Sequence, residues 1–151
     1  MHEIKAKVLT FKVATEQYLR TKIRPDHPGL TWLVGWAALS INISRRGPDG
    51  RTAWELRHGK PFRRKVCMFG EHVMWLKVRK EHGMQERWFH GCFLGLALTS
   101  DNVLVSNEEG GVVIARTIRR LPESSARDCS HFNAVRGTPW NPNPSVDGRA
   151  P

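Results

Sequence analysis

Three cysteines and seven histidines are the residues of this sequence that could bind a transition metal. Zinc prefers thiolate and imidazole ligands in a tetrahedral arrangement. Cys67, His72, His82 and Cys92 carry such groups, but their spacing matches no common zinc finger and the sequence contains no CxxC pair. We therefore expect no metal site and ordinary burial of the cysteines. Because the cysteines are scattered and odd in number, they indicate a reducing compartment rather than a disulfide framework.

Nucleophilic and metal-assisted hydrolysis have little support in the sequence. No Gly-x-Ser-x-Gly occurs, and the dipeptide His2-Glu3 lacks the second histidine that an HExxH motif would place four residues after the first. No glycine-rich loop precedes a helix to bind phosphate. Asp26, Asp49 and Asp101 lie in expected turns, where an aspartate caps the backbone. No catalytic residue is therefore predicted.

Phosphate binding has better support, because positive side chains gather in three short stretches of the chain. The stretches comprise Arg45, Arg46 and Arg51; Lys60, Arg63, Arg64 and Lys65; and Arg116, Arg119 and Arg120. Guanidinium groups pair two donors with phosphate oxygens and stack on bases, so arginine clusters suit nucleic acid. We expect the three clusters to flank one small sheet and to bind DNA, or alternatively RNA, without reading its sequence. The alternative is an ordinary solvated surface.

The composition agrees with an anionic partner. The 151 residues include 24 Lys and Arg against 14 Asp and Glu, which gives a net charge of +10. Most of that excess lies in residues 1–64, which hold 13 basic and 5 acidic side chains. A membrane surface is the weaker expectation, because no apolar run approaches the length of a span and the N-terminus lacks the apolar stretch of a signal peptide. We expect a nuclear or cytoplasmic protein that is not secreted.

Three helices are expected within residues 1–64. The first spans about 3–23, where an apolar stripe runs from Ile4 to Tyr18 until Pro25 ends the pattern. The second spans about 28–43 and is apolar on most sides, so it is expected to be buried. The third spans 52–58, between a capping box that Thr52 opens and a glycine cap.

From residue 65 onward the periodicity changes to the alternation of strands. Strands are expected at 72–78, 87–95, 102–106 and 112–119. So many short strands indicate a small antiparallel SH3-like barrel, in which Gly91 and Gly95 would mark bends. Residues 122–151 are rich in Pro, Asn, Ser and Gly, so we expect a disordered tail or linker. Trp140 is the exception there, either docked locally or part of a linker.

The order of these blocks resembles the integrase region of copia-type retrotransposon polyproteins. In the helical part, the resemblance is carried by Ile41-Asn42, Gly50-Arg51-Thr52, Trp54-Glu55 and Gly59-Lys60-Pro61-Phe62. In the strand part it is carried by Phe69-Gly70-Glu71-His72-Val73, Arg87-Trp88, Gly91-Cys92-Phe93-Leu94-Gly95, Gly111-Val112-Val113 and Ala115-Arg116. Residues 132–140 resemble the linker that follows. The resemblance covers roughly residues 8–140, and its specificity lies in the order and spacing of the blocks.

The resemblance implies a parent enzyme with an RNase H-like core, in which two Asp and one Glu hold two divalent metals for phosphoryl transfer. By its register those carboxylates fall before Met1, so we expect a fragment without catalysis and Mg²⁺ only in the intact parent. Glu3 is the nearest carboxylate, but a single Glu without Asp partners cannot organise the metal pair. The resemblance also implies that the small β module contacts DNA.

The sequence therefore predicts an α+β protein in three parts: a helical remnant of an RNase H-like core at 1–64, an SH3-like barrel at 65–121 and a disordered tail at 122–151. The predicted function is sequence-independent DNA binding by a piece of a Pol polyprotein, with no cofactor. The alternatives are a protein-interaction module that self-associates or binds the missing integrase core, an integrase piece completed in trans, and a decayed element without selected function. The apolar helix faces are expected to pack on the β module or on another chain.

Overall fold

In the described residues, the chain folds as three helices, then five strands, then two short helices, which confirms the predicted α+β class. The computed structural model describes residues 2–62, 66–79, 85–97 and 102–144. Helices α1 (His2–Leu19), α2 (Gly29–Ser44) and α3 (Ala53–His58) precede the sheet, and α4 (Glu123–Ala126) and α5 (Ser130–Asn133) follow it. No described helix has the combined length and apolarity of a membrane span.

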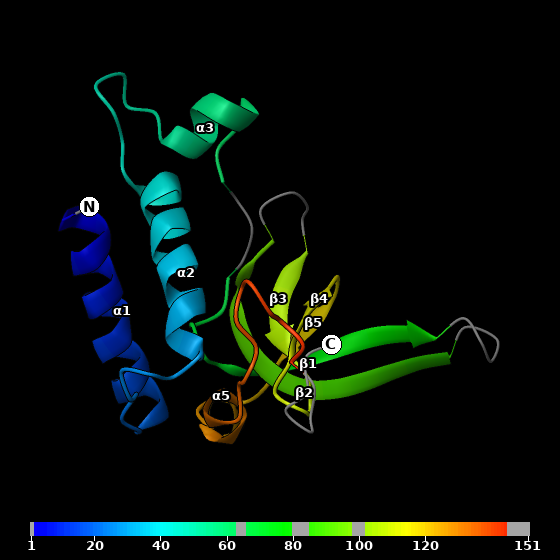
Figure 1. Cartoon of the computed structure of the whole chain (residues 1–151). Helices are drawn as coiled ribbons and strands as arrows, with labels where there is room; N and C mark the ends of the chain where they lie inside the picture. Colours follow the sequence, from blue (N-terminus) through cyan, green and yellow to red (C-terminus); the bar gives the residue numbers. More distant parts are fainter. Residues whose placement is uncertain (1, 63–65, 80–84, 98–101, 145–151) are drawn as a thin grey trace.

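Helices α1 and α2 lie side by side as a hairpin to one side of the sheet (Figure 1). α1 ends earlier than predicted, because Arg20 adopts a left-handed conformation with φ of 54°. The carboxylate of Glu16 then accepts a hydrogen bond from the amide of Ile23 at 2.8 Å, which fixes the chain after the helix. α2 begins directly after Pro28, as predicted for a proline in a first turn.

The Thr52 cap and the glycine cap predicted for α3 are confirmed. Thr52 is extended, and its hydroxyl accepts a hydrogen bond from the amide of Glu55 at 3.1 Å. Gly59 ends the helix in the left-handed conformation, with φ of 76°. Both devices satisfy backbone groups that a six-residue helix would otherwise leave unpaired.

The five strands form one antiparallel sheet in the order β4-β3-β2-β1-β5. Their bounds are β1 His72–Arg79, β2 Gln85–Leu96, β3 Val103–Ser106, β4 Val112–Ala115 and β5 Ile118–Arg120. The long strand β2 pairs with β1 along its first part and with β3 along its last part, so it belongs to both halves of the sheet. Its register shifts between Phe93 and Gly95, where Gly95 has φ of 128°. The predicted bend at Gly95 is therefore confirmed.

The two edges of the sheet are joined by very little chain. β4 is one edge and β5 is the other, yet only Arg116 and Thr117 separate them in sequence. The predicted single strand at 112–119 is therefore two strands that pair with different neighbours. A two-residue connection between opposite edges requires the sheet to curl, and the carbonyl of Thr117 accepts a hydrogen bond from the amide of Leu76 on β1 at 3.1 Å.

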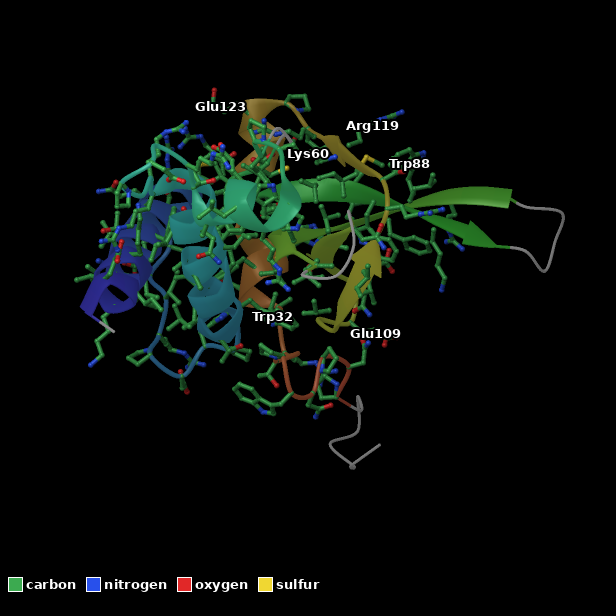
Figure 2. All side chains as sticks on the ribbon, turned by 90° about the horizontal axis from the view of Figure 1, so that it is seen from above. Trp32, Lys60, Trp88, Glu109, Arg119 and Glu123 are labelled. Carbon is green, nitrogen blue, oxygen red and sulfur yellow. The ribbon has the colours of Figure 1, made fainter. Side chains whose placement is uncertain are left out.

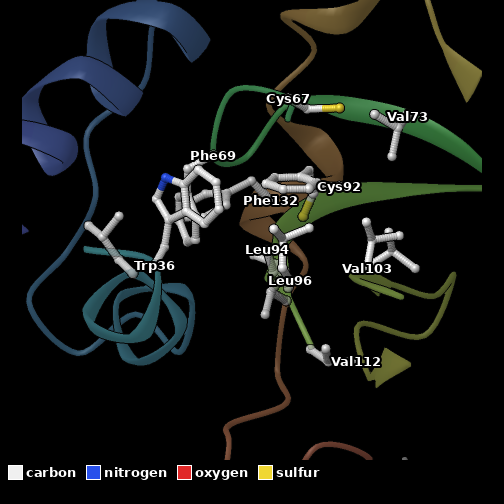
Figure 3. Packing of buried hydrophobic residues seen from close by; sticks show 14 of the residues in the cluster. Trp36, Cys67, Phe69, Val73, Cys92, Leu94, Leu96, Val103, Val112 and Phe132 are labelled. Carbon is white, nitrogen blue, oxygen red and sulfur yellow. The ribbon is translucent and has the colours of Figure 1, made fainter. Parts of the chain in front are cut away.

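Helices and sheet share one hydrophobic core, so the predicted parts do not have separate interiors. Trp36 of α2 meets Phe93 of β2 edge to face, with ring centroids 5.4 Å apart. Figure 3 shows this packing continuing through Phe69 and Phe132 toward the sheet interior. The helices were expected to pack either on the β module or on another chain, and the structure shows packing on the β module.

Within residues 122–144, the prediction of a disordered tail is wrong. Phe132 of α5 is 0% exposed and stacks on His27 at 4.7 Å between ring centroids. The indole of Trp32 on α2 donates a hydrogen bond to the carbonyl of Gly137 at 2.8 Å. Trp140, in contrast, is 76% exposed and does not dock. Residues 145–151 of the predicted tail lie outside the described residues.

Candidate nucleic-acid interface

The loop between α2 and α3 carries the first predicted basic cluster. Arg45 pairs with Glu3 at the start of α1, and Arg46 lies 3.4 Å from the carboxylate of Glu55 on α3. Arg51 is exposed, and no carboxylate in the described part of the chain pairs with it. Because exposed ion pairs of this kind contribute roughly 0–1 kcal/mol, Arg45 and Arg46 could exchange their partners for phosphate at small cost.

The second predicted cluster is only partly described. Lys60 follows the glycine cap of α3 and is exposed. Arg63, Arg64 and Lys65 lie outside the described residues. Arg46 contacts Glu55 on α3, and Lys60 directly follows the Gly59 cap of the same helix. The first cluster and Lys60 therefore gather around this short helix.

The third predicted cluster lies on the sheet and divides by role. Arg116 and Arg119 are exposed, and no described carboxylate pairs with either. Arg120 instead forms two 2.9 Å hydrogen bonds to the buried carboxylate of Glu71. Arg120 is therefore engaged in an ion pair with a buried carboxylate of the fold, and its role in nucleic-acid binding stays a prediction.

Among the described residues, the first cluster and Lys60 do not lie beside the third cluster on the sheet, which corrects the predicted arrangement. α3 and the loop before it lie beyond the end of α2, well away from β5 (Figure 1). The basic groups thus form two separate regions: one around α3, and one on the strands β1, β2 and β5. The strand region is the one where positive and aromatic side chains come together.

Arg119 and Trp88 form the centre of the strand region. Arg119 pairs with Met74 of β1, and Trp88 pairs with Leu76 two residues further along the same strand, so both side chains belong to one face of the sheet. The guanidinium carbon of Arg119 lies 4.8 Å from the centre of the Trp88 ring, a cation–π contact. Figure 2 shows the two side chains together on the outside of the strands. We call this surface, defined by Met74, Leu76, Trp88 and Arg119, the Trp88 face.

The opposite face of the same strands has mixed charge. Lys77 and Arg87 are register partners, and the guanidinium of Arg87 lies 5.2 Å from the ring centre of Phe89. Lys77 and Phe89 line a shallow pocket together with Glu108 and Glu109 from the turn before β4. A polyanion meets repulsion there, so the Trp88 face is the better candidate. Trp88 is not among the binding residues predicted from the sequence, although strand alternation places it on the surface opposite to Phe89.

A histidine cluster lies beside the Trp88 face. His72, His90 and His131 come from β1, β2 and α5, and their potential ligand atoms all lie within 4.8 Å of one another. His72 Nε2 is 2.9 Å from His90 Nδ1, and the rings of His72 and His131 stack with centroids 4.2 Å apart. Burial, followed by the nearby imidazole of His72, lowers the pKa of His131. Among the described residues these three are the one group of potential metal ligands that converges.

The predicted burial of the cysteines is confirmed for two of the three. Cys67 and Cys92 are buried, and burial raises the pKa of each thiol to about 12. Both are therefore neutral thiols at physiological pH and poor metal ligands in this fold. His82 of the rejected zinc set lies outside the described residues. His72 also belongs to that rejected set, and in the structure it lies in the histidine cluster described above.

The chain matches no known protein-family model, no curated protein and no solved structure. Function is therefore inferred from the geometry of these residues and from the order of motifs in the sequence. The Trp88 face and the histidine cluster are the two features that carry such inferences.

Proposed function

We propose that the chain binds nucleic acid, with DNA as the main partner, through the Trp88 face and without reading base sequence. The observation that carries the proposal is the exposed guanidinium of Arg119 on β5 lying over the indole of Trp88 on β2, across the intervening strand β1. Arginine supplies paired donors for phosphate, and an aromatic ring supplies a surface on which any base can stack. Arg116, three residues before Arg119, adds a second exposed cation.

The proposal includes the fold that the sequence resemblance suggests. We infer an SH3-like barrel of the kind that follows the catalytic core in copia-type integrases. The curled five-stranded sheet supports this inference, because β4 and β5 are opposite edges joined by two residues. The capped helix α3 also supports it, since Thr52, Glu55 and Gly59 belong to the motif block that carries the resemblance. In this proposal the chain contributes DNA binding to integration and performs no catalysis itself.

Binding can be tested with a fluorescent DNA duplex and anisotropy at 50 and 200 mM salt. We expect the affinity to fall by at least about tenfold over this range, because neutralised phosphates release counterions. Arg119→Ala and Trp88→Ala should each weaken binding by roughly 1–3 kcal/mol of stacking and phosphate contact. Arg24→Ala is the matched control, because Arg24 is an exposed arginine paired with Asp26 between α1 and α2. Equal affinity at both salt concentrations, or an Arg119→Ala variant as tight as the control, would refute the proposal.

A second candidate function, protein interaction, has one observation in its favour. Leu9 and Val13 lie one turn apart on α1 and are 61% and 44% exposed. Adjacent apolar side chains on an open helix face are a common feature of interfaces. Saturable binding to protein that is insensitive to salt, and that Leu9→Glu abolishes, would favour this function over DNA binding.

A further inference from the structure

We propose that His72, His90 and His131 form a binding site for a divalent transition metal, with zinc as the best match. The site lies where β1, β2 and α5 meet, and its ligands come from three distant parts of the sequence. The proposal is independent of nucleic-acid binding, because none of its observations involves Arg119 or Trp88.

The antiparallel register brings the first two ligands together. His72 pairs with Cys92, and Met74 pairs with His90, so His72 and His90 are diagonal neighbours on one face of β1 and β2. Diagonal positions are within reach of long side chains in an antiparallel pair. The observed distance of 2.9 Å between His72 Nε2 and His90 Nδ1 shows that both rings direct a nitrogen to one point.

The third ligand is positioned by the hydrophobic core. His131 is the neighbour of Phe132, whose side chain is fully buried against Phe69 and His27. This anchoring fixes α5 against the sheet and places the His131 ring over that of His72. A zinc ion with bonds of about 2.0–2.1 Å needs its nitrogens roughly 3.3 Å apart. The present spacings, 2.9 Å between His72 and His90 and up to 4.8 Å within the cluster, bracket this value, so metal binding would require the rings to adjust.

The hydrogen bonding of His72 matches that of a metal ligand. Its Nδ1 lies 3.0 Å from the carbonyl oxygen of Ser125 on α4, and a carbonyl accepts only from a protonated nitrogen. Nδ1 must therefore carry the hydrogen, and in the neutral ring this leaves the lone pair of Nε2 directed at His90. Metal-binding histidines commonly donate their other nitrogen to a carbonyl in this way, because the bond fixes the tautomer and the ring orientation.

The donor set selects the class of metal. Three neutral imidazoles suit zinc, and also copper, nickel and cobalt, whereas magnesium and calcium require oxygen ligands. Three protein ligands leave the fourth tetrahedral position to water. Asp128 lies between α4 and α5 and interacts electrostatically with His131, so its carboxylate offers partial compensation for a dication. We assign the site a structural role: the metal would tie α4 and α5 to the β1–β2 hairpin.

The test uses the full chain, freed of metal with a chelator and titrated with Zn²⁺ by calorimetry in the absence of nucleic acid. We expect one Zn²⁺ per chain, and a rise in Tm of about 5–10 °C at a hundredfold excess over Kd. Co²⁺ should give visible absorption bands of a four-coordinate site. The single variants His90→Gln and His131→Gln should each weaken Zn²⁺ binding by at least about tenfold, the lower limit for loss of a supporting group.

His58→Gln is the matched control, since His58 is an exposed histidine on α3 that stacks on Trp54. It should bind Zn²⁺ as the unmodified chain does. His90 and His131 are used rather than the buried His72, so that loss of binding does not simply reflect misfolding, and circular dichroism of each variant checks this point. Either of two results overturns the proposal: no saturable Zn²⁺ or Co²⁺ binding by the unmodified chain, or equal binding by His90→Gln and His58→Gln. Loss of zinc binding with intact DNA affinity would leave the proposed function standing.

Discussion

The guanidinium of Arg120 donates to both carboxylate oxygens of Glu71, with Nε–Oε2 and Nη2–Oε1 distances of 2.9 Å each. Glu71 is 1% exposed in its side chain, whereas Arg120 is 59% exposed. The amide of Met68 donates to the same carboxylate at 3.0 Å, so the pair joins the chain before β1 to the edge strand β5. The hydrogen bond to Glu71 is also the main reason that the pKa of Arg120 is raised. A buried carboxylate needs such a partner, because desolvation disfavours its charge.

Replacing Arg120 should therefore reduce stability rather than nucleic-acid binding alone. Arg120→Ala leaves the buried carboxylate of Glu71 with the amide of Met68 and no cation, at a cost of about 1–3 kcal/mol. Urea denaturation measures this loss. Arg119→Ala on the same strand is the control and should change the free energy of unfolding by no more than about 0.5 kcal/mol. Equal stability of the two variants would show that the Arg120–Glu71 pair contributes nothing.

The slope of DNA affinity against salt should report the phosphate contacts of the strand region. If Arg116 and Arg119 each neutralise one phosphate, the double variant Arg116→Ala/Arg119→Ala should reduce the slope of log K against log salt by about 1.8. The corresponding change in the loop, Arg45→Ala/Arg51→Ala, tests whether the region around α3 also contacts the same DNA. An unchanged slope in the strand variant, with a reduced slope in the loop variant, would move the interface to α3.

The local signals in the sequence predicted the elements well. The capping box at Thr52, the glycine cap at Gly59 and the bend at Gly95 each depend on neighbouring residues, so they can be identified without the fold. The tail could not be predicted in this way. Phe132 lies in a segment whose composition resembles a linker, and its burial depends on contacts with His27 and Phe69 that only the tertiary structure brings together.

The candidate sites also depend on tertiary contacts, so they could be predicted only in part from neighbouring residues. Arg119 was predicted from local charge, but its partner Trp88 depends on the register of β1 with both β2 and β5. His72, His90 and His131 are far apart in sequence and form no spacing motif, so the cluster appears only when α5 packs on the sheet. Arg120 was assigned to binding because its carboxylate partner is 49 residues away.

The capping box provides a third prediction, limited to α3. Thr52→Ala removes the hydroxyl that accepts from the amide of Glu55 and should destabilise this helix by about 1 kcal/mol. Amide hydrogen exchange of residues 53–58 should become correspondingly faster, while exchange in β2 stays the same. Thr52→Ser retains the acceptor and serves as the control. Protection in α3 that does not change on Thr52→Ala would contradict the assigned role of the cap.

Phe132 allows a direct test of the ordered C-terminal segment. Phe132→Ala removes a fully buried ring that packs on Phe69, and large-to-small changes of this kind cost about 3–5 kcal/mol. Trp140→Ala is the matched control, because that side chain is 76% exposed, and it should have little effect on unfolding. Thermal denaturation of both variants makes the comparison. A Phe132→Ala variant as stable as Trp140→Ala would mean that the segment is not part of the core.

His27 connects this segment to the pH dependence of stability. Its Nδ1 accepts a hydrogen bond from the amide of Gly29 at 2.9 Å, and its ring stacks on Phe132. Burial lowers its pKa from the ordinary value of 6.5, and this effect outweighs the opposite effect of a backbone hydrogen bond at Asn133. A protonated His27 would lose the hydrogen bond from Gly29, because Nδ1 would then become a donor.

The folded state should therefore become less stable as the pH falls below 6.5. In that range the unfolded chain takes up a proton at His27 that the folded chain does not, so the free energy of unfolding falls by up to about 1.4 kcal/mol per pH unit until the lowered folded pKa is reached. Urea denaturation between pH 7.5 and 5, in the presence of a chelator, measures the slope.

His27→Phe keeps the stacking but cannot titrate, so its slope should be smaller, whereas His58→Gln should keep that of the unmodified chain. The pKa of His131 is lowered as well, so the slope of His27→Phe should decrease further when His131→Gln is added. A stability that does not change between pH 7.5 and 5 in the unmodified chain would show that neither histidine is held neutral by the fold.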